Sequence, residues 1–186
     1  MAGFQVTEWN HRLLTGLIPQ GGICIDATAG TGRDSLFLAQ QVGETGHVIS
    51  FDIQQTAIEQ TRERLEAAGC EERVELILDS HTRMSQYVTE SVDVILFNLG
   101  YLPGGDHTIA TRPESSLLAV EQGLTLLKKG GVMSLCVYSG GDTGMEEYDR
   151  LTKWAAELSG KEYLVIRNDF YNRKNHPPVI ILIFKL

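Results

Sequence analysis

A glycine turn between two carboxylates is the first feature of this chain that could bind a cofactor. Gly30 and Gly32 lie in a short segment that follows Asp26, and Asp52 comes 20 residues after Gly32. Glycine has no Cβ, so the backbone of such a turn can come close to a ligand. A carboxylate at the position of Asp52 can accept hydrogen bonds from two ribose hydroxyls. The spacing therefore predicts a site for a nucleoside-containing cofactor.

NAD and S-adenosylmethionine are both bound by such turns, and three features favour S-adenosylmethionine. The NAD pattern G-x-G-x-x-G asks for a small third residue where this chain has Ser35, which is a poor match. S-adenosylmethionine carries an ammonium group, which a carboxylate such as Asp26 can bind directly. The chain of 186 residues is also short for a nicotinamide enzyme, which needs a second mononucleotide-binding half. A nicotinamide oxidoreductase stays an alternative at this point.

Polar and aromatic residues follow two later apolar runs. Ser80 and His81 come after the run 73–78, where we expect them to hydrogen-bond and pack on an adenine. Asn98 ends the run 92–98 and begins the string Asn-Leu-Gly-Tyr, which ends at Tyr101. Methyltransferases that act on exocyclic amines carry an acidic or amide residue here, followed by Pro-Pro and an aromatic. We expect Asn98 to accept hydrogen bonds from a substrate N–H and Tyr101 to stack on a base.

Loops at the same end of the predicted strands supply candidate substrate contacts. Gly104, Gly105, Asp106 and His107 belong to a long glycine-bearing loop, and Tyr138 follows a separate apolar run. Long loops at this position usually act on substrates. Asp106 and His107 are also candidates for assisting proton removal from an amine.

Alternating strands and helices must position these residues. Apolar runs predict strands, and 3.6-residue periodicity predicts helices. The strands are expected at 23–27, 47–52, 73–78, 92–98, 132–138, 162–167 and 179–185, and the helices at 33–42, 54–68, 114–128 and 145–158. This order predicts βαβ units and one doubly wound, Rossmann-like α/β domain over residues 1–186. No helix separates the last two strands, so we expect a seven-stranded, mostly parallel sheet with one antiparallel strand near its edge.

Composition bounds the class of protein. The three cysteines are odd in number and far apart, which argues against a disulfide framework and a structural zinc site, and we expect no metal. No signal peptide or membrane-spanning run is visible, so we expect a cytoplasmic protein with no membrane partner. The net charge of −8 argues against a large basic surface. Arg173 and Lys174 nevertheless form a local basic cluster with Arg167 and His176, and we expect them to bind RNA.

Three sequence strings together resemble one known family, and the resemblance runs over nearly the whole chain. They are Asp26-Ala27-Thr28-Ala29-Gly30-Thr31-Gly32-Arg33-Asp34, Phe51-Asp52-Ile53-Gln54 and Phe97-Asn98-Leu99-Gly100-Tyr101-Leu102-Pro103-Gly104-Gly105-Asp106. The chain is similar to the YtqB-like (MnmM) family, long labelled rRNA methylases. In relatives, Asn-Gly-His often stands where this chain has Thr31-Gly32-Arg33, and a histidine often stands where it has Ser139.

The resemblance implies a class I methyltransferase that uses S-adenosylmethionine. Its implied acceptor is the aminomethyl group of 5-aminomethyl-2-thiouridine at the tRNA wobble position, with the anticodon region as partner and a homodimer as assembly. It also implies cofactor contacts by Thr28, Asp34 and Gln54, and catalytic roles for Asn98, Tyr101 and Asp106. The alternatives are an N-methyltransferase of rRNA or another RNA base, and a cofactor-binding module without catalysis.

Overall fold

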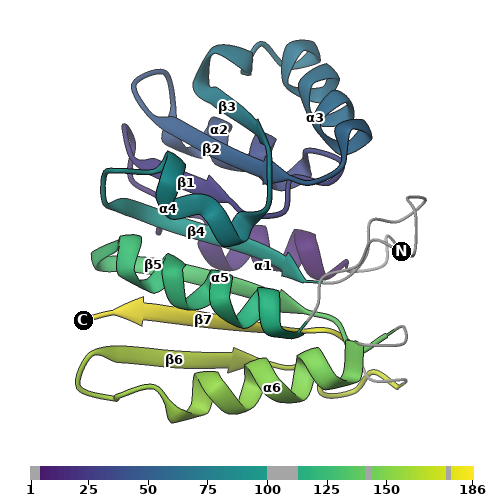
Figure 1. Cartoon of the computed structure of the whole chain (residues 1–186), viewed down its shortest axis with the longest axis vertical. Coiled ribbons are helices and arrows are strands. Elements are labelled where there is room, and N and C mark those ends of the chain that lie inside the picture. Colours follow the sequence, from purple (N-terminus) through teal and green to yellow (C-terminus); the bar gives the residue numbers. More distant parts are fainter. Residues whose placement is uncertain (1–4, 100–112, 141–143, 175–176) are drawn as a thin grey trace.

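The computed structural model describes residues 5–99, 113–140, 144–174 and 177–186. Within these residues seven strands form one sheet in the order β3-β2-β1-β4-β5-β7-β6 (Figure 1). Neighbouring strands are parallel except where β7 pairs, antiparallel, with β5 and with β6. The expected doubly wound sheet with one antiparallel strand near its edge is confirmed. The strands are β1 (Ile23–Asp26), β2 (His47–Asp52), β3 (Val74–Leu78), β4 (Val92–Leu99), β5 (Leu127–Val137), β6 (Tyr163–Asn168) and β7 (Val179–Lys185).

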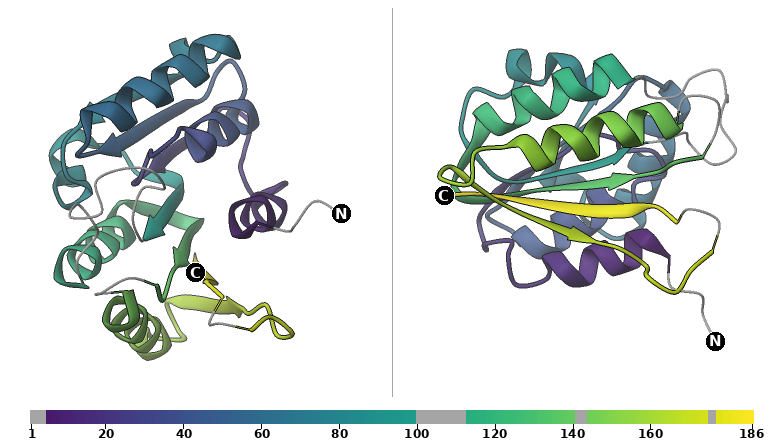
Figure 2. Two further views of the ribbon diagram at one scale, coloured as in Figure 1. Left: turned by 90° about the vertical axis from the view of Figure 1, so that its right-hand side faces the viewer. Right: turned by 90° about the horizontal axis from the view of Figure 1, so that it is seen from below.

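Helices cover both faces of the sheet, and each face has its own apolar cluster. Residues of α1, α2 and α3 pack on one face, and residues of α4, α5 and α6 pack on the other. Figure 2 shows α5 and α6 on one side of the strands and α1 on the other. The helices are α1 (Val6–Leu14), α2 (Arg33–Val42), α3 (Gln55–Ala67), α4 (Met84–Tyr87), α5 (Pro113–Leu126) and α6 (Gly144–Glu157), with the 3-10 turns η1 (Glu71–Arg73) and η2 (His81–Arg83).

The side chains of β4 alternate between the two faces of the sheet, and this alternation determines the face on which Asn98 lies. Val94 and Leu96 belong to the cluster under α1–α3, whereas Ile95 and Phe97 belong to the cluster under α4–α6. Successive side chains of a strand point to opposite faces, so Asn98 lies on the α1–α3 face at the carboxyl end of the strand. In Figure 1 the arrowheads of β4, β5 and β6 point toward this same edge.

Helix α1 was not predicted from the sequence. It buries Val6, Asn10 and Leu14, which are spaced by four residues along one side of the helix. The middle residue is polar and interrupts an apolar stripe, and a nine-residue helix is stable mainly through tertiary packing. The Ser134 hydroxyl of β5 donates to Asn10 Oδ1 at 2.6 Å, which holds the helix against the sheet.

The predicted helix 114–128 is corrected at its end. Helix α5 ends at Leu126, and β5 already begins at Leu127. The register against β4 shifts between Val92 and Val94, and Gly130 has φ +80° within this irregular start. Pairing with β4 therefore overrides the helical pattern of these residues.

All three cysteines are buried, and none of them forms a disulfide bond. In the part of the chain that is described, no helix has both the length and the apolar character needed to cross a membrane.

Candidate functional site

Asp26 stabilises the turn between β1 and α2. Its side chain is completely buried, and its carboxylate accepts hydrogen bonds from Thr28 N–H at 3.1 Å and from the Ser35 hydroxyl at 2.6 Å. Gly32 has φ +77°, and a Cβ at this position would come within 2.8 Å of Thr61 Cα in α3. The glycine is required by its backbone conformation and by this close approach. Direct contact of Asp26 with an ammonium group stays a prediction, because here both of its oxygens serve the turn.

Asp52 joins the end of β2 to the same turn. One carboxylate oxygen accepts Gly30 N–H at 2.9 Å, and the other accepts Gln54 N–H at 2.9 Å. The side chain is only half-buried, and a carboxylate has about four lone-pair sites, so acceptor capacity remains for ribose hydroxyls. Ile53 follows it with 56% of its surface exposed. Ile53 was not singled out in the sequence; its signal is an apolar residue between an acidic strand end and a helix start.

Ser80 and His81 follow β3, and His81 reaches back to the residue that follows β1. The Ser80 hydroxyl accepts Thr82 N–H at 3.2 Å and so caps η2. His81 Nδ1 lies 3.1 Å from the Ala27 carbonyl, which can only accept, so this nitrogen carries the proton. Burial lowers the pKa of His81, so the ring is neutral at pH 7. His81 therefore lies beside the start of the glycine turn, and contact of Ser80 and His81 with an adenine stays a prediction.

Asn98 is held at the glycine turn by both its backbone and its side chain. Its N–H donates to Thr28 Oγ1 at 2.7 Å, and its side-chain Nδ2 donates to Asp34 Oδ2. Its Oδ1 is buried and has no hydrogen-bond partner among the described residues. Buried acceptors are rarely left without a partner, and such an exception calls for a functional explanation. The amide is thus oriented with its donor group satisfied and its acceptor available.

Asp34 connects this amide to helix α1. Its other oxygen lies 2.5 Å from His11 Nε2, and Asp34 itself is 3% exposed. The His11 ring stacks on Phe37 of α2 with a centroid distance of 3.9 Å, which fixes the ring. The resemblance suggested a cofactor contact for Asp34, whereas in the structure its two oxygens contact His11 and Asn98. The sequence did not indicate this role of His11, because α1 itself was not predicted.

Tyr138 also contacts α1. It follows β5, its N–H donates to Leu99 O at 3.3 Å, and its phenol hydrogen-bonds the Thr7 side chain. Burial raises the pKa of the phenol, which stays neutral. Its predicted role in substrate binding remains a prediction.

The remaining predicted substrate residues fall into two groups. Tyr101, Gly104, Gly105, Asp106 and His107 lie outside the described residues, as does His176. Arg173 and Lys174 are exposed in the loop after β6, at the sheet edge where β4 also ends.

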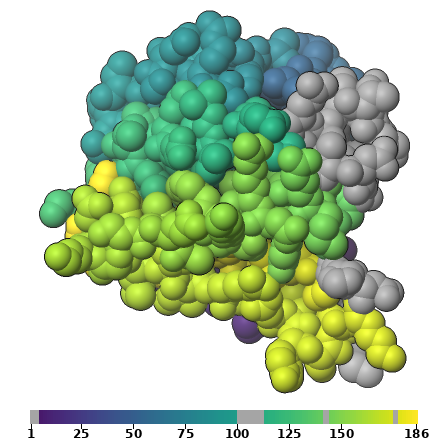
Figure 3. Space-filling view, turned by 60° about the horizontal axis from the view of Figure 1, so that its bottom comes forward, coloured from purple at the N-terminus to yellow at the C-terminus, as the bar shows by residue number. Residues whose placement is uncertain are grey.

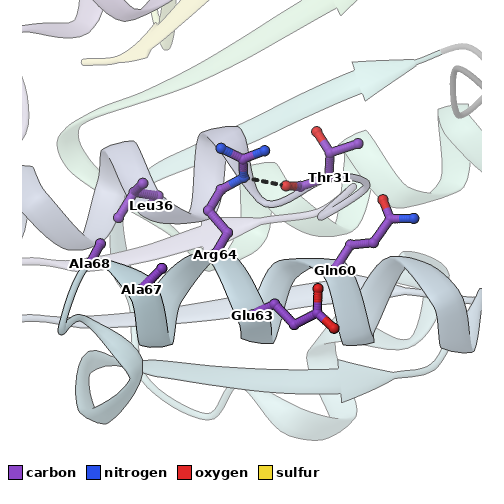
Figure 4. A pocket seen from close by; sticks show the side chains of 7 residues that line it. All are labelled: Thr31, Leu36, Gln60, Glu63, Arg64, Ala67 and Ala68. Carbon is purple, nitrogen blue, oxygen red and sulfur yellow. Dashed lines mark hydrogen bonds between the residues drawn. The ribbon is translucent and has the colours of Figure 1, made fainter.

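A groove between α2 and α3 contains none of the predicted site residues. It is lined by Thr31, Leu36, Gln60, Glu63, Arg64, Ala67 and Ala68 (Figure 4). Arg64 Nε crosses it to donate to Thr31 O at 2.6 Å. This contact stabilises the outer side of the glycine turn, so the groove has a structural explanation.

The electrostatics of the site favour a cationic ligand. Burial, followed by the negative charge of Asp34 and then that of Asp52, raises the pKa of Asp26 from 3.8 to about 7. The negative charges of Asp26, Asp34 and Asp52 therefore act on the same region, where the described residues do not supply enough positive charge to balance them. S-adenosylmethionine, with its positively charged sulfonium and ammonium groups, fits these carboxylates, whereas they would repel the two phosphates of NAD. The residues that would hold it are Asp52, the Gly30–Gly32 turn, Ile53, Ser80 and His81.

Comparisons with known proteins show which proteins this chain is similar to. A family model described as "Putative rRNA methylase" matches residues 48–184. The tRNA (mnm(5)s(2)U34)-methyltransferase of Arabidopsis thaliana chloroplasts is 35% identical over 97% of this chain and 69% of its own length. A crystal structure titled as a putative rRNA methylase from Clostridium thermocellum superposes with a TM-score of 0.95 at 39% identity, covering 100% of both chains. A putative methyltransferase from Streptococcus mutans, solved with SAH, gives a TM-score of 0.88 at 34% identity over 98% of this chain and 99% of that one.

Proposed function

The chain belongs to the "Putative rRNA methylase" family and is an S-adenosylmethionine-dependent RNA methyltransferase, and from that premise we propose its substrate. The substrate is the aminomethyl group of 5-aminomethyl-2-thiouridine at the wobble position of tRNA. The relative from Arabidopsis thaliana, whose name specifies the methylated form of that nucleoside at position 34 of tRNA, supports this proposal because it aligns with 97% of the chain. We propose that Arg173 and Lys174 bind the anticodon region.

The unpaired Asn98 Oδ1 is the observation that carries the proposal. A primary amine has N–H groups to donate, and the site offers one buried acceptor without a partner, at the carboxyl end of β4. A hydrogen bond from the amine to Oδ1 would leave the nitrogen lone pair free and fix its direction. Orientation of this kind accounts for much of the rate of a displacement reaction. Asn98 therefore acts as the acceptor that aims the amine.

Asp34 and His11 position Asn98. An amide side chain can present either its oxygen or its nitrogen, and the Asp34 carboxylate can accept only from the nitrogen. This choice leaves Oδ1 for the substrate. His11, stacked on Phe37, holds the second oxygen of Asp34 and prevents the carboxylate from turning away.

The cofactor, when bound, supplies an electrophilic methyl group on its sulfonium sulfur. The chain's own residues supply binding and positioning. The Asp52 carboxylate accepts hydroxyl groups, and the exposed Ile53 offers an apolar surface to a base. The first-turn N–H groups of α2 cannot be satisfied within the helix and can donate to polar ligand atoms. The negative field of Asp26, Asp34 and Asp52 favours positive charge in this region.

The amine must be neutral when it reacts. An alkyl ammonium has no lone pair, and the Asn98 amide does not titrate, so Asn98 is not the base. We propose that Asp106 or His107 assists the loss of the proton.

Methylation of rRNA or another RNA base is the second candidate, favoured by the description of the family model. Nucleoside mass spectrometry of total tRNA and rRNA from a deletion strain distinguishes the two. Our proposal expects 5-aminomethyl-2-thiouridine to accumulate in tRNA and its methylated form to disappear, with restoration by the wild-type gene. Unchanged tRNA nucleosides together with loss of a methyl group from rRNA would contradict the proposal and support the alternative.

A further inference from the structure

The loop that joins β6 to β7 contains a turn with an aromatic side chain at its tip. Arg173 N–H donates to Phe170 O at 2.9 Å, which closes a four-residue turn around Tyr171 and Asn172. Phe170 is half-buried and packs against the apolar cluster under α1–α3. Tyr171, the next residue, is 100% exposed. The turn is therefore anchored by one aromatic ring while it presents another to solvent.

This exposure is unusual for the chain. The other large apolar side chains on the described surface that count as exposed are 41–56% exposed, so each of them keeps a large part of its surface covered. A completely exposed ring contributes no burial to folding, so packing does not explain its presence. Figure 3 shows the yellow part of the chain projecting from the body of the molecule near this loop.

Positive charge follows the exposed ring. Residues 170–178 contain no aspartate or glutamate, although the whole chain has a net charge of −8. Arg173 and Lys174 are exposed, and neither forms an ion pair with the described residues. Arg167 differs, because Asp169 holds its guanidinium at 2.8 Å. The free cations of this loop are therefore concentrated directly after Tyr171.

The turn lies at the sheet edge that carries the site. β5 is parallel to β4, and β7 is antiparallel to both β5 and β6, so β6 runs parallel to β4 and both strands end at this edge. Three strand spacings separate them, which is a lateral distance of about 14 Å. Figures 1 and 2 show the β6–β7 loop at the end of the molecule where β4 and β5 end. A bound RNA strand with one nucleotide at Asn98 can reach the turn with a neighbouring nucleotide.

We propose that residues 170–174 form a contact for single-stranded RNA, in which the Tyr171 ring stacks on an unpaired base near the modified nucleotide. Arg173 and Lys174 bind the adjacent phosphates. Aromatic rings interleaved with cations are the usual means of binding single strands, because every base has a face on which a ring can stack. The proposal rests on RNA as substrate and does not depend on which nucleotide is methylated.

Equilibrium binding of a fluorescently labelled anticodon stem-loop RNA tests the contact. Tyr171→Ala should raise the dissociation constant by about 5- to 160-fold, the range for loss of one stacked base. Tyr171→Phe keeps the ring and should bind like the wild type. Leu164→Ala, at a half-exposed apolar residue of β6, is the matched control and should also bind like the wild type. Calorimetry should give the same S-adenosylmethionine affinity for all four proteins.

Salt dependence separates the ring from the cations. The slope of log affinity against log salt should become shallower by about 0.7 for each of Arg173→Ala and Lys174→Ala, because each removes one phosphate contact. Tyr171→Ala should leave the slope unchanged.

Three results would overturn the contact. They are wild-type RNA affinity in Tyr171→Ala, equal weakening in Tyr171→Phe, or a wild-type dimer that Tyr171→Ala converts to a monomer in sedimentation velocity. The last result would identify the turn as a protein interface. If instead RNA binding depends on Tyr171 while no tRNA nucleoside is methylated, the proposed substrate fails and the RNA contact stands.

Discussion

Replacing Asn98 with alanine should abolish most methyl transfer while leaving the fold almost as stable as before. The substitution removes a hydrogen bond from Nδ2 to the Asp34 carboxylate, a contact of a kind that contributes about 1.5–3 kcal/mol. It also removes Oδ1, whose burial without a partner costs about 1–3 kcal/mol. Because the two contributions oppose each other, we expect the free energy of unfolding to change by no more than about 2 kcal/mol.

The effect on catalysis has no such compensation. The amine loses the acceptor that directs its lone pair, and misplacement of a reacting group by about 1 Å can cost roughly 100-fold in rate. We therefore expect kcat/KM for methyl transfer to tRNA to fall by about 100-fold, with unchanged cofactor affinity. Transfer of a labelled methyl group to undermethylated tRNA measures the first quantity, and calorimetry measures the second.

Asn10→Ala is the matched control for this experiment. Asn10 is also a buried asparagine with one unpaired atom, Nδ2, and one bonded atom, Oδ1, but its partner is Ser134 in the middle of the sheet. It should change thermal stability by a similar small amount and leave kcat/KM near the wild-type value. The reasoning is refuted if Asn98→Ala keeps wild-type kcat/KM. It is equally refuted if Asn98→Ala loses more than about 3 kcal/mol of stability, because the amide oxygen would then have a structural partner.

Three further predictions concern the carboxylates. Asp52→Ala should raise the dissociation constant of S-adenosylmethionine by about 10- to 100-fold in calorimetry, because it removes a charged hydrogen-bond acceptor. An unchanged dissociation constant would show that Asp52 does not bind the ribose. Asp34→Ala should lower kcat, and Asp34→Ala with Asn98→Ala should have a kcat no lower than that of Asn98→Ala alone; additive losses would show that the two act separately. Burial raises the pKa of Asp26 to about 7, so its stabilising contribution is complete below about pH 3.8 and is lost as the pH rises through about 7. Thermal melts of the cofactor-free protein should therefore show the wild type losing stability relative to Asp26→Asn between about pH 5 and pH 8, and parallel curves would contradict the raised pKa.

Local patterns in the sequence were sufficient for most of the fold. The glycine turn, the strand ends at Asp26 and Asp52, and the direct connection between the last two strands each depend on short-range rules. A strand that returns without a crossover helix pairs antiparallel, and parallel strands bring their carboxyl ends to one edge. Asn98 was therefore placed beside the turn correctly, and its contact with Thr28 confirms that placement.

The same rules failed where a segment depends on its partners. Helix α1 is short and has a buried asparagine in its apolar stripe, and residues 127–131 follow the register of β4 instead of their helical pattern. In both places the free energy of pairing or packing with a distant element exceeds the local preference of the chain.

The sequence by itself determined the fold class, the cofactor and the strand ends that carry Asp26, Asp52 and Asn98. Only the tertiary structure decided what those side chains face. Asp34 meets Asn98 across 64 residues and His11 across 23, and no local pattern in the sequence indicates these contacts. Tyr171 and Phe170 are adjacent aromatic residues, of which one is fully exposed and the other packs on the core, and no local pattern records this difference. The physical reason is the same in each case: periodicity specifies which face of an element a residue occupies, whereas its partners depend on how distant elements pack.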